Sequence, residues 1–462
     1  MRNLRYLLAV IACTGLLLAG CGGGGGGMGG SSGTSSGGSS SGGSSGGSSS
    51  GGSSSGPSGP NVTAVTVDGG PAGLPQPSVN MLYATVKVCV PGTATCQTID
   101  HIQVDTGSYG LRLLAGALTN PGAFTVENEM STGKPIGECT IFADGYSWGP
   151  VVNVDMTVGG DMTMGNAESA SNIPVQIIGG FMSGTVPPDC ITDAPVNNEE
   201  DTIAVFGANG ILGVGPFAQD CGQYCTDNSQ PQSGNYYVCT TPVNSSGSCT
   251  AHTVGLTQQV INPVSAFATD NTGVVIQMAA VPAAGSATAT GYLLFGINTQ
   301  SNNQMPNSAT VLTLLPNTLM IGSNLVYSGS MTVMYKGTSL PNSFIDSGSN
   351  GNFFTDASFT ECAQNSDAPG FYCSSEPNLS ATNQAVDMND DTTGVNSTQT
   401  FSVTDATSLL SNNNFNAFST LAGTNSDSTS FDWGLPFFYG KTVYTAIDGA
   451  AVGNATGPFF AY

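Results

Sequence analysis

Two short segments far apart in the chain end in nearly the same four residues. Ile102–Ser108 reads Ile-Gln-Val-Asp-Thr-Gly-Ser, and Asn342–Ser349 reads Asn-Ser-Phe-Ile-Asp-Ser-Gly-Ser. Their aspartates, Asp105 and Asp346, are 241 positions apart (346 minus 105). In a chain this rich in Gly and Ser, two such motifs arise together by chance roughly once in two hundred sequences. The matching apolar residues before each aspartate therefore favour two similar halves, each presenting one aspartate.

The residue types of this repeated motif suit two carboxyl groups that face each other. Two carboxyls at hydrogen-bonding distance cannot both ionise, so they share a proton. The charged one can then activate a water, and the protonated one can polarise a carbonyl. Gly107 and Gly348 allow the backbone to turn tightly beside Asp105 and Asp346. Hydroxyl groups that hold the carboxyls and link the two loops are expected from Thr106, Ser108, Ser347 and Ser349.

The N-terminus has the parts of a bacterial lipoprotein signal. A basic start (residues 1–5), an apolar run (residues 6–18) and two small residues precede Cys21. This run is too short to span a membrane together with its cleavage site. We expect residues 1–20 to be removed and Cys21 to carry the lipid, with Gly22 after it favouring the outer membrane. An uncleaved anchor or a plain secretory signal is the alternative.

A tether is expected at residues 21–60, because residues 22–60 are almost wholly Gly and Ser. Such a flexible segment reaches roughly 35 Å on average, enough to hold a domain clear of lipid headgroups. It contains no lysine. A basic propeptide that covers an acidic site is therefore not expected here.

The cysteines indicate an exported protein. Apart from Cys13 and Cys21, ten remain, and an even count in an oxidising compartment predicts up to five disulfides. Cys89 with Cys96 and Cys362 with Cys373 are the expected local pairs, whereas Cys221, Cys225, Cys239 and Cys249 cannot be assigned. The chain has two histidines, so Cys221-x-x-x-Cys225 lacks the further soft ligands of a metal site, and we expect no metal.

The formal net charge of −23 makes nucleic acid and anionic lipid surfaces poor partners. Lowering the pH would neutralise carboxylates and reduce the repulsion among them. This fits an acid-tolerant or acid-active exported protein, and equally an acidic surface protein of another kind.

An all-β fold is predicted for the rest of the chain. No segment from residue 61 onward keeps apolar residues at helical spacing over three turns, and short runs rich in Val, Ile, Thr, Phe and Tyr recur between Gly, Pro, Asn and Asp clusters. We expect an N-terminal lobe at residues 61–278 and a C-terminal lobe at 279–462, with residues 279–291 crossing between them. One short helix is expected at 356–364. Surface loops are expected at about 186–253 and 375–430.

Further segments resemble the pepsin-like, two-lobed aspartic proteases. Gly210-Ile-Leu-Gly213 resembles the segment that completes the first aspartate loop in that family, and residues 431–448 resemble its counterpart in the second lobe. Residues 83–93 look like the hairpin before the first aspartate. The chain also looks like a bacterial lipoprotein branch with the same two motifs. The resemblance covers most of residues 80–300 and 330–450, and it implies a cleft between two lobes with Asp105 and Asp346 facing each other.

The flap hairpin of that family corresponds to residues 140–149. This chain has Phe142 where the family carries a flap tyrosine, and Arg112 where the family has the tryptophan that binds that tyrosine. The altered pair indicates either a repacked flap or a decayed active site. Phe142, Gly145, Tyr146 and Trp148 are the candidate flap and substrate-contacting residues. Tyr146 and Trp148 are equally well interpreted as residues that pack the hairpin.

Two functions of different classes follow from these features. The first is an aspartic endopeptidase in which Asp105 and Asp346 activate a water to hydrolyse an extended polypeptide bound between the lobes. The second is a catalytically inactive module of the same fold that binds peptide or glycan. The intact motifs favour the first, and the altered flap favours the second. We expect a monomer without cofactor or nucleic acid partner, anchored in the outer membrane on the periplasmic or cell-surface side.

Overall fold

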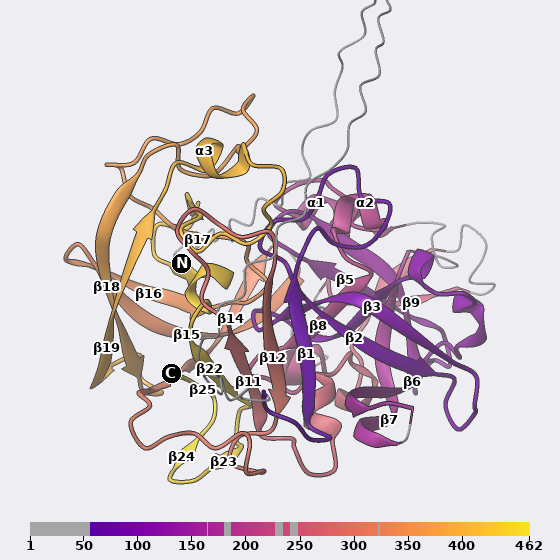
Figure 1. Cartoon of the computed structure of the whole chain (residues 1–462). Coiled ribbons are helices and arrows are strands. Elements are labelled where there is room, and N and C mark those ends of the chain that lie inside the picture. The colour runs from indigo at the N-terminus through magenta and orange to yellow at the C-terminus, as the bar shows by residue number, and fades with distance from the viewer. Residues whose placement is uncertain (1–55, 164, 180–185, 227–233, 241–247, 322–323) are drawn as a thin grey trace, which may run out of the picture.

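The computed structural model describes residues 56–163, 165–179, 186–226, 234–240, 248–321 and 324–462. Figure 1 shows two lobes side by side, the N-terminal one in indigo and magenta and the C-terminal one in orange and yellow. Strands dominate both lobes, which confirms the all-β prediction. The α-helices of the described part are short: α1 Pro188–Asp193, α2 Ile203–Phe206 and α3 Ala406–Leu410.

The N-terminal lobe is a single series of paired strands that folds over on itself. Their order is β10-β9-β5-β6-β7-β4-β8-β3-β2-β1, and β2 also pairs with β6. Because side chains alternate between the faces of a strand, Val86, Val88, Val152 and Val154 point into one buried core. The strands are β1 Val62–Val67, β2 Leu82–Cys89, β3 Cys96–Asp105, β4 Tyr109–Leu114, β5 Ile136–Ile141, β6 Tyr146–Asp161, β7 Asn166–Ile178, β8 Gly210–Val214, β9 Tyr236–Cys239 and β10 Cys249–Ala251.

The C-terminal lobe has its own sheet, in the order β19-β18-β15-β16-β21-β17-β20, with β14 paired to β15. Its core is aromatic: Phe354 stacks on Phe431 with ring centroids 4.7 Å apart, and Trp433 packs against Phe431 at 4.2 Å. The strands are β14 Leu315–Ile321, β15 Asn324–Tyr335, β16 Thr338–Ile345, β17 Asn352–Phe354, β18 Glu376–Val386, β19 Thr392–Val403, β20 Ala422–Gly423 and β21 Phe431–Trp433.

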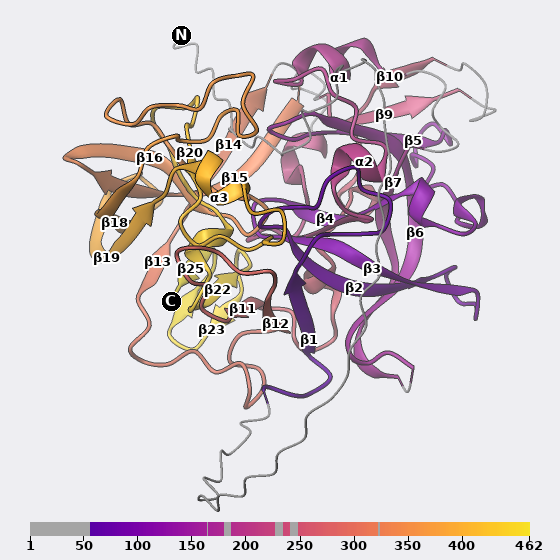
Figure 2. The same cartoon turned by 45° about the horizontal axis from the view of Figure 1, so that its top comes forward.

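A sheet shared by the two lobes joins strands from both ends of the chain, in the order β1-β12-β11-β22-β25-β13. Figure 2 shows β1, β11, β12 and β22 together between the lobes. Residues 279–288 connect β11 to β12, which are antiparallel neighbours, so the expected boundary after residue 278 lies inside a hairpin of this sheet. The strands are β11 Gly273–Met278, β12 Ala289–Phe295, β13 Val311–Thr313, β22 Thr442–Ala446 and β25 Phe459–Ala461; β23 Ala451–Val452 and β24 Ala455–Thr456 form a separate hairpin.

Five disulfides join the ten cysteines of the folded region. The two expected local pairs, Cys89–Cys96 and Cys362–Cys373, are confirmed. The remaining pairs are Cys139–Cys190, Cys221–Cys225 and Cys239–Cys249. Because Cys221 and Cys225 bond to each other, they do not form a metal site. The Cys139–Cys190 bond links β5 to α1 and so fixes the hairpin that carries the flap residues.

Three local expectations are wrong. The segment 356–364 forms turns and a single bridge instead of a helix. The polar stretch expected to be a loop at 375–430 contains the long hairpin β18–β19 and helix α3. The stretch 186–253 contains α1, α2, β9 and β10 as well as β8.

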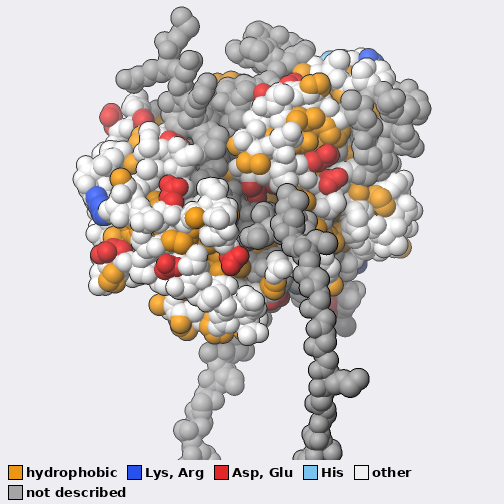
Figure 3. All heavy atoms as spheres, turned by 90° about the horizontal axis from the view of Figure 1, so that it is seen from above, with side chains coloured by type: hydrophobic (Ala, Val, Ile, Leu, Met, Phe, Trp, Pro, Cys, Tyr) orange, Lys and Arg blue, Asp and Glu red, His pale blue; other side chains and the backbone are white. Residues whose placement is uncertain are grey.

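Acidic side chains are spread over the face of the molecule shown in Figure 3, with few basic ones among them. This distribution fits the formal net charge of −23. Within the described residues, the structure contains no helix of the length and apolar character needed to cross a membrane. The predicted signal and Cys21 lie outside the described residues.

Candidate active site

Each of the two aspartates lies at the end of a strand, and that strand pairs with a short parallel strand. Asp105 is the last residue of β3, and Asp346 directly follows β16. β8 runs parallel to β3 with Gly213 opposite Asp105, and β21 runs parallel to β16 with Trp433 opposite Ile345. The two lobes therefore repeat one local arrangement, in which a neighbouring strand fixes the end of the strand that carries the aspartate.

The two aspartate loops exchange hydrogen bonds reciprocally. Ser347 N–H donates to Thr106 Oγ1 at 2.9 Å, and Thr106 N–H donates to Ser347 Oγ at 3.1 Å. Each hydroxyl then donates to the backbone of the other lobe, Thr106 to the Ile345 carbonyl at 3.1 Å and Ser347 to the Val104 carbonyl at 2.8 Å. Both hydroxyl residues are buried. This exchange holds the two loops in one fixed position relative to each other.

The carboxyl groups of Asp105 and Asp346 meet beside this exchange. Gly107 N–H donates to Asp105 Oδ1 and Gly348 N–H donates to Asp346 Oδ1, both at 2.7 Å. A methyl group on Gly107 would lie 2.7 Å from the Asp346 carboxyl carbon, and one on Gly348 would lie 2.5 Å from Asp105 Oδ1. Each carboxyl therefore lies against the glycine of the opposite loop, an approach too close for any side chain.

The surroundings of the Asp346 carboxyl, Asp105 among them, shift its pKa. Burial raises the pKa of Asp346 well above its ordinary range; the charges of Asp105 and Asp432 and a hydrogen bond with Asp105 raise it further, while the Gly348 N–H acts in the opposite direction. A carboxyl in this position keeps its proton when its neighbour is charged. The expected pair with one shared proton is thus the arrangement that the described geometry favours.

The serine that ends each motif has different surroundings in the two lobes. Ser349 Oγ lies 2.8 Å from Asp346 Oδ2 and 2.6 Å from Asp432 Oδ2. Ser108 Oγ is buried and has no hydrogen-bond partner among the described residues. The expected hydroxyl contacts are therefore present for Thr106, Ser347 and Ser349, whereas the expected contact of Ser108 with a carboxyl is not.

Asp432 is the site residue that sequence reasoning missed. It lies in β21 opposite Phe344 of β16. The equivalent position in the first lobe is Ile211 of β8, which lies opposite Gln103 of β3. Asp432 is 2% exposed. Burial raises its pKa well above the ordinary range, the hydrogen bond with Ser349 lowers it, and the Asp105 charge raises it. The available signal was an acidic residue inside a strand that is otherwise apolar.

The turn of the β5–β6 hairpin carries Phe142 and Gly145. Phe142 N–H donates to the Gly145 carbonyl at 2.9 Å. The Phe142 ring is partly buried beside Phe206, with ring centroids 6.1 Å apart, in a cluster that includes Ile211 of β8. Because β8 pairs with β3, this cluster connects the hairpin turn to the strand that ends at Asp105.

Tyr146 and Trp148 do not lie beside Phe142. Both are buried, at 4% and 1% exposure, in a different cluster that contains the Cys139–Cys190 disulfide. Trp148 makes an edge-to-face contact with Tyr237 of β9 at 5.4 Å. The structure thus supports the alternative in which these two aromatic residues pack the hairpin, and Phe142 and Gly145 remain as flap candidates.

A second pair of carboxyl groups supports the hairpin turn. Burial raises the pKa of Glu200 well above its ordinary range, and the charge of Asp144 and a hydrogen bond with it act in the same direction. Asn198 Nδ2 donates to the Asp144 carbonyl at 3.2 Å, and Tyr146 N–H donates to the Asn198 carbonyl at 2.9 Å. The segment 198–200 therefore holds the hairpin turn through these hydrogen bonds, beside a buried Glu200 carboxyl whose raised pKa favours its protonated form.

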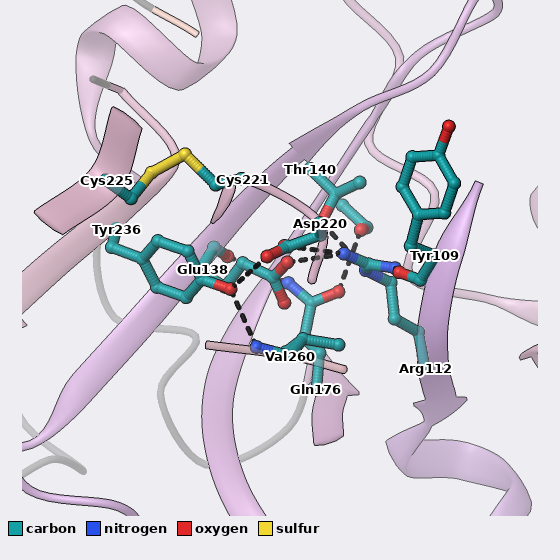
Figure 4. A network of polar contacts seen from close by, with 11 residues as sticks. Tyr109, Arg112, Glu138, Thr140, Gln176, Asp220, Cys221, Cys225, Tyr236 and Val260 are labelled. Atoms are coloured by element: carbon teal, nitrogen blue, oxygen red, sulfur yellow. Dashed lines mark hydrogen bonds and ion pairs between the residues drawn. A yellow bond between two sulfur atoms is a disulfide. The ribbon is translucent and has the colours of Figure 1, made fainter. Parts of the chain in front are cut away.

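Arg112 lies in a buried network of polar contacts (Figure 4). Its guanidinium donates to Glu138 at 2.5 Å, to Asp220 at 3.0 Å and to Thr140 Oγ1 at 2.9 Å. Asp220 also accepts from the Tyr236 hydroxyl at 2.7 Å. Arg112 is 1% exposed. Since both Glu138 and Thr140 belong to β5, this network fixes the base of the hairpin, which favours a repacked flap over a decayed site.

The described site consists of carboxyl, hydroxyl and backbone groups. Within the part of the chain that the structure describes, no group of three or more His, Cys, Asp and Glu side chains is placed to hold a metal ion. A pair of carboxyls that shares one proton can accept a proton from a water and donate one to a carbonyl oxygen. The geometry therefore suits acid–base chemistry on a water molecule.

Fold and site together define an all-β, two-lobed protein in which each lobe contributes one aspartate loop. The chain belongs to the family described as "Protein of unknown function (DUF3443)", whose model matches residues 57–462. No curated protein matches it. Among solved structures it is similar to the aspartic proteinase from Irpex lacteus (16% identity, TM-score 0.43, 86% of this chain and 96% of that chain covered). It is also similar to Basic 7S globulin from soybean (10% identity, TM-score 0.44, coverage 87% and 95%).

Proposed function

We propose that this protein is an aspartic endopeptidase that hydrolyses peptide bonds with a water activated between Asp105 and Asp346. The observation that supports this most is the contact between the two carboxyls, held by loops that bind each other through Thr106 and Ser347. A protein that only binds ligands does not need two carboxyls in contact, because burying them together opposes folding unless a proton is shared.

In this proposal the ionised carboxyl takes a proton from the water as the water oxygen attacks the scissile carbonyl. The protonated carboxyl donates its proton to the carbonyl oxygen, so that a neutral tetrahedral diol forms. The carboxyl that took the proton of the water donates it to the leaving nitrogen. As the C–N bond breaks, the other carboxyl takes a proton from a diol hydroxyl, so the pair returns to one shared proton. The reaction needs one proton on the pair, so activity should form a bell at acidic pH.

The substrate in this proposal is an extended polypeptide bound between the lobes. Phe142 and its apolar neighbours would contact a side chain of that polypeptide, while Gly145 lets the hairpin turn pack closely against Asn198, where an added methyl group would collide with the backbone oxygen.

A second candidate function is a binding module for peptide or glycan without turnover. The observation that favours it is the altered flap, in which Phe142 has no hydroxyl and Arg112 is fully engaged in a buried network. We rank it second because the network fixes the hairpin and leaves the aspartate loops complete.

For its location, we propose a lipid anchor on Cys21 that holds a monomer at the outer membrane, on the periplasmic or cell-surface side. The basis is the sequence of residues 1–21 and the Gly/Ser segment after it. Cys21→Ala should move the protein from the membrane fraction to the soluble fraction; a variant that stays with the membrane would contradict the anchor.

The experiment that tests the function uses purified protein and an unfolded polypeptide substrate between about pH 3 and 7. Hydrolysis should vanish in Asp105→Asn and in Asp346→Asn, with circular dichroism retained, and a statine-type transition-state analogue should inhibit it. Cleavage that survives Asp105→Asn would indicate a contaminant. Absence of cleavage at every pH, with measurable peptide or glycan binding, would establish the binding module instead.

A further inference from the structure

One serine hydroxyl lies between two buried carboxyl groups. Ser349 Oγ is 2.8 Å from Asp346 Oδ2 and 2.6 Å from Asp432 Oδ2, and both distances are those of O–H···O hydrogen bonds. Asp432 Oδ1 is buried and has no hydrogen-bond partner among the described residues. The two carboxyls are thus linked through a single hydroxyl group.

Counting protons shows what this link requires. A hydroxyl has one proton to donate, so Ser349 can donate to Asp346 or to Asp432, but not to both. The second short contact is a hydrogen bond only if that carboxyl carries a proton and donates it to Ser349 Oγ. The contact between Asp105 and Asp346 needs another proton. All contacts are satisfied when Asp432–H donates to Ser349, Ser349 donates to Asp346, and one proton is shared by Asp105 and Asp346.

The charges around Asp432 support the protonated form. The titratable groups that act on it are Asp105 and Asp346, both acidic. Among the described residues, no Lys, Arg or His makes an ion pair with it. A buried carboxyl with acidic neighbours and no cation retains its proton.

The fold itself does not require an acid at this position. The corresponding residue of the first lobe is Ile211. It occupies the equivalent register position in the parallel pair β3–β8 that Asp432 occupies in the parallel pair β16–β21. Ile211 is buried in an apolar cluster. Because one lobe forms this arrangement with an aliphatic side chain, the carboxyl of Asp432 calls for an explanation in chemistry and not in packing.

We propose that Asp432 is a positioning residue whose protonated carboxyl aims the Ser349 hydroxyl at Asp346, and whose ionisation reverses that hydroxyl and ends activity at higher pH. The proposal rests on the endopeptidase function proposed above. When Asp432 loses its proton, Ser349 donates to the new carboxylate, and Asp346 Oδ2 loses its donor. A second negative charge then lies next to the Asp105–Asp346 pair, which with its shared proton already carries one. Asp432 would in this way set the upper pH limit of hydrolysis.

The first test compares the pH profiles of the purified full chain and two variants. Asp432→Asn cannot ionise but keeps a donor toward Ser349, and Asp432→Ile has the side chain of the first lobe. We expect the basic limb of the kcat profile to move up by about one pH unit in both, the size of a single like-charge interaction. The acid limb should keep its position, and Asp432→Asn should be faster than Asp432→Ile. Basic limbs that coincide with that of the unmodified protein would overturn the proposal.

The second test does not depend on activity, so it separates this inference from the proposed function. A group whose pKa is raised by folding contributes stability below its unfolded pKa and loses it as the pH rises through the folded pKa. The Tm difference between Asp432→Asn and the unmodified protein should therefore increase in favour of the variant from about pH 4 to pH 8. A pH-independent difference would show that Asp432 is not held protonated, and would overturn the proposal even if hydrolysis is observed.

Asp356→Asn is the matched control for this measurement. Burial acts to raise the pKa of Asp356, but hydrogen bonds from Lys336, Ser358 and Tyr335 lower this pKa to about 2. The contribution of Asp356 to stability is present above its unfolded pKa and is lost as the pH falls toward 2. The Tm of Asp356→Asn relative to the unmodified protein should therefore fall toward neutral pH, the opposite of the trend expected for Asp432→Asn. If the chain hydrolyses nothing but the two Tm trends are opposite as stated, the proton on Asp432 is supported and the endopeptidase function alone fails.

Discussion

The two aspartate loops have almost the same sequence and the same backbone hydrogen bonds, but different neighbours. In each loop the glycine N–H donates to its own aspartate at 2.7 Å, and Thr106 and Ser347 exchange equivalent bonds. The serines at the ends of the motifs differ, because Ser349 links two carboxyls whereas Ser108 has no partner among the described residues. The neighbouring strand supplies an acid to one loop and Ile211 to the other.

This difference teaches where such a pair of loops is constrained. Every group that joins the two loops must match its partner across the lobes, so a change on one side leaves a buried group unpaired on the other. The strand beside each loop has no such partner across the lobes, so its side chains can differ. Chemical asymmetry between Asp105 and Asp346 therefore arises from neighbours outside the repeated motif, among them Asp432.

The largest expected effect comes from disturbing the two contacts in which Gly107 and Gly348 each lie against the carboxyl group of the opposite loop. Gly107→Ala and Gly348→Ala place a methyl group 2.7 Å and 2.5 Å from the nearest atom of the opposite carboxyl. Either change should separate the pair, lowering kcat by about 100-fold or more and stability by about 1–3 kcal/mol. The measurements are peptide hydrolysis and thermal unfolding. Gly116→Ala, where an added methyl meets nothing within 4 Å, is the control; a Gly107→Ala variant as active as that control would contradict the contact.

The next effect comes from removing one side of the hydroxyl exchange. Thr106→Val leaves the Ser347 N–H without its acceptor and the Ile345 carbonyl without its donor. Ser347→Ala leaves the Thr106 N–H without its acceptor and the Val104 carbonyl without its donor. We expect each to lower the free energy of unfolding by about 2–4 kcal/mol, because both abandoned groups are buried. Thr106→Ser and Ser347→Thr keep the hydroxyl and should retain most of the stability in chemical denaturation. Equal losses in the conservative variants would indicate a packing effect instead.

A smaller effect distinguishes the two loops from each other. Ser349→Ala removes the donor to Asp346 Oδ2 and should lower kcat by about tenfold, the size expected for the loss of one buried hydrogen bond. Ser108→Ala removes a hydroxyl without a partner among the described residues, so its effect should be much smaller. Parallel pH–rate profiles of both variants provide the measurement. Equal losses would mean that the two loops work alike and that the asymmetry has no consequence for the reaction.

The sequence was informative wherever a residue type allows few alternatives. The repeated Asp-[Thr/Ser]-Gly-Ser motif predicted both loops, and short cysteine spacing predicted two disulfides. The all-β class followed from short runs rich in Val, Ile, Thr, Phe and Tyr. The sequence was not informative about β18 and β19, because their many Asn, Ser and Thr residues are typical of loops. Those strands form because they pair with each other and with β15, a contact that no local pattern records.

The site shows the same limit at the level of single residues. Arg112 was noted for what it replaces, but its partners Glu138 and Asp220 are 26 and 108 residues away in sequence. Ser349 and Asp432 are 83 residues apart. Contacts at such separations depend on the register of paired strands, and one sequence without its fold does not specify that register.

The smallest expected effect concerns the first lobe, which has its own pair of carboxyls at the hairpin turn. Burial and the neighbouring Asp144 raise the pKa of Glu200, so its contribution to stability is present below its unfolded pKa and is lost as the pH rises through the folded value. Glu200→Gln cannot ionise, so its Tm relative to the unmodified protein should rise from about pH 4 to pH 8, by about 2 °C for each kcal/mol in a domain of this size.

The control for Glu200→Gln is Glu129→Gln in the same lobe. Burial acts to raise the pKa of Glu129, but hydrogen bonds from Ser131 and Thr132 lower this pKa to about 2. Its variant should therefore lose Tm toward neutral pH, the opposite trend. If the Tm of Glu200→Gln shows the same trend with pH as that of Glu129→Gln, the hairpin turn does not depend on a proton held by Glu200. If the trends are opposite, the hairpin turn depends on a proton on Glu200 that is lost as the pH rises, so the segment 198–200 holds the turn more firmly at acidic pH.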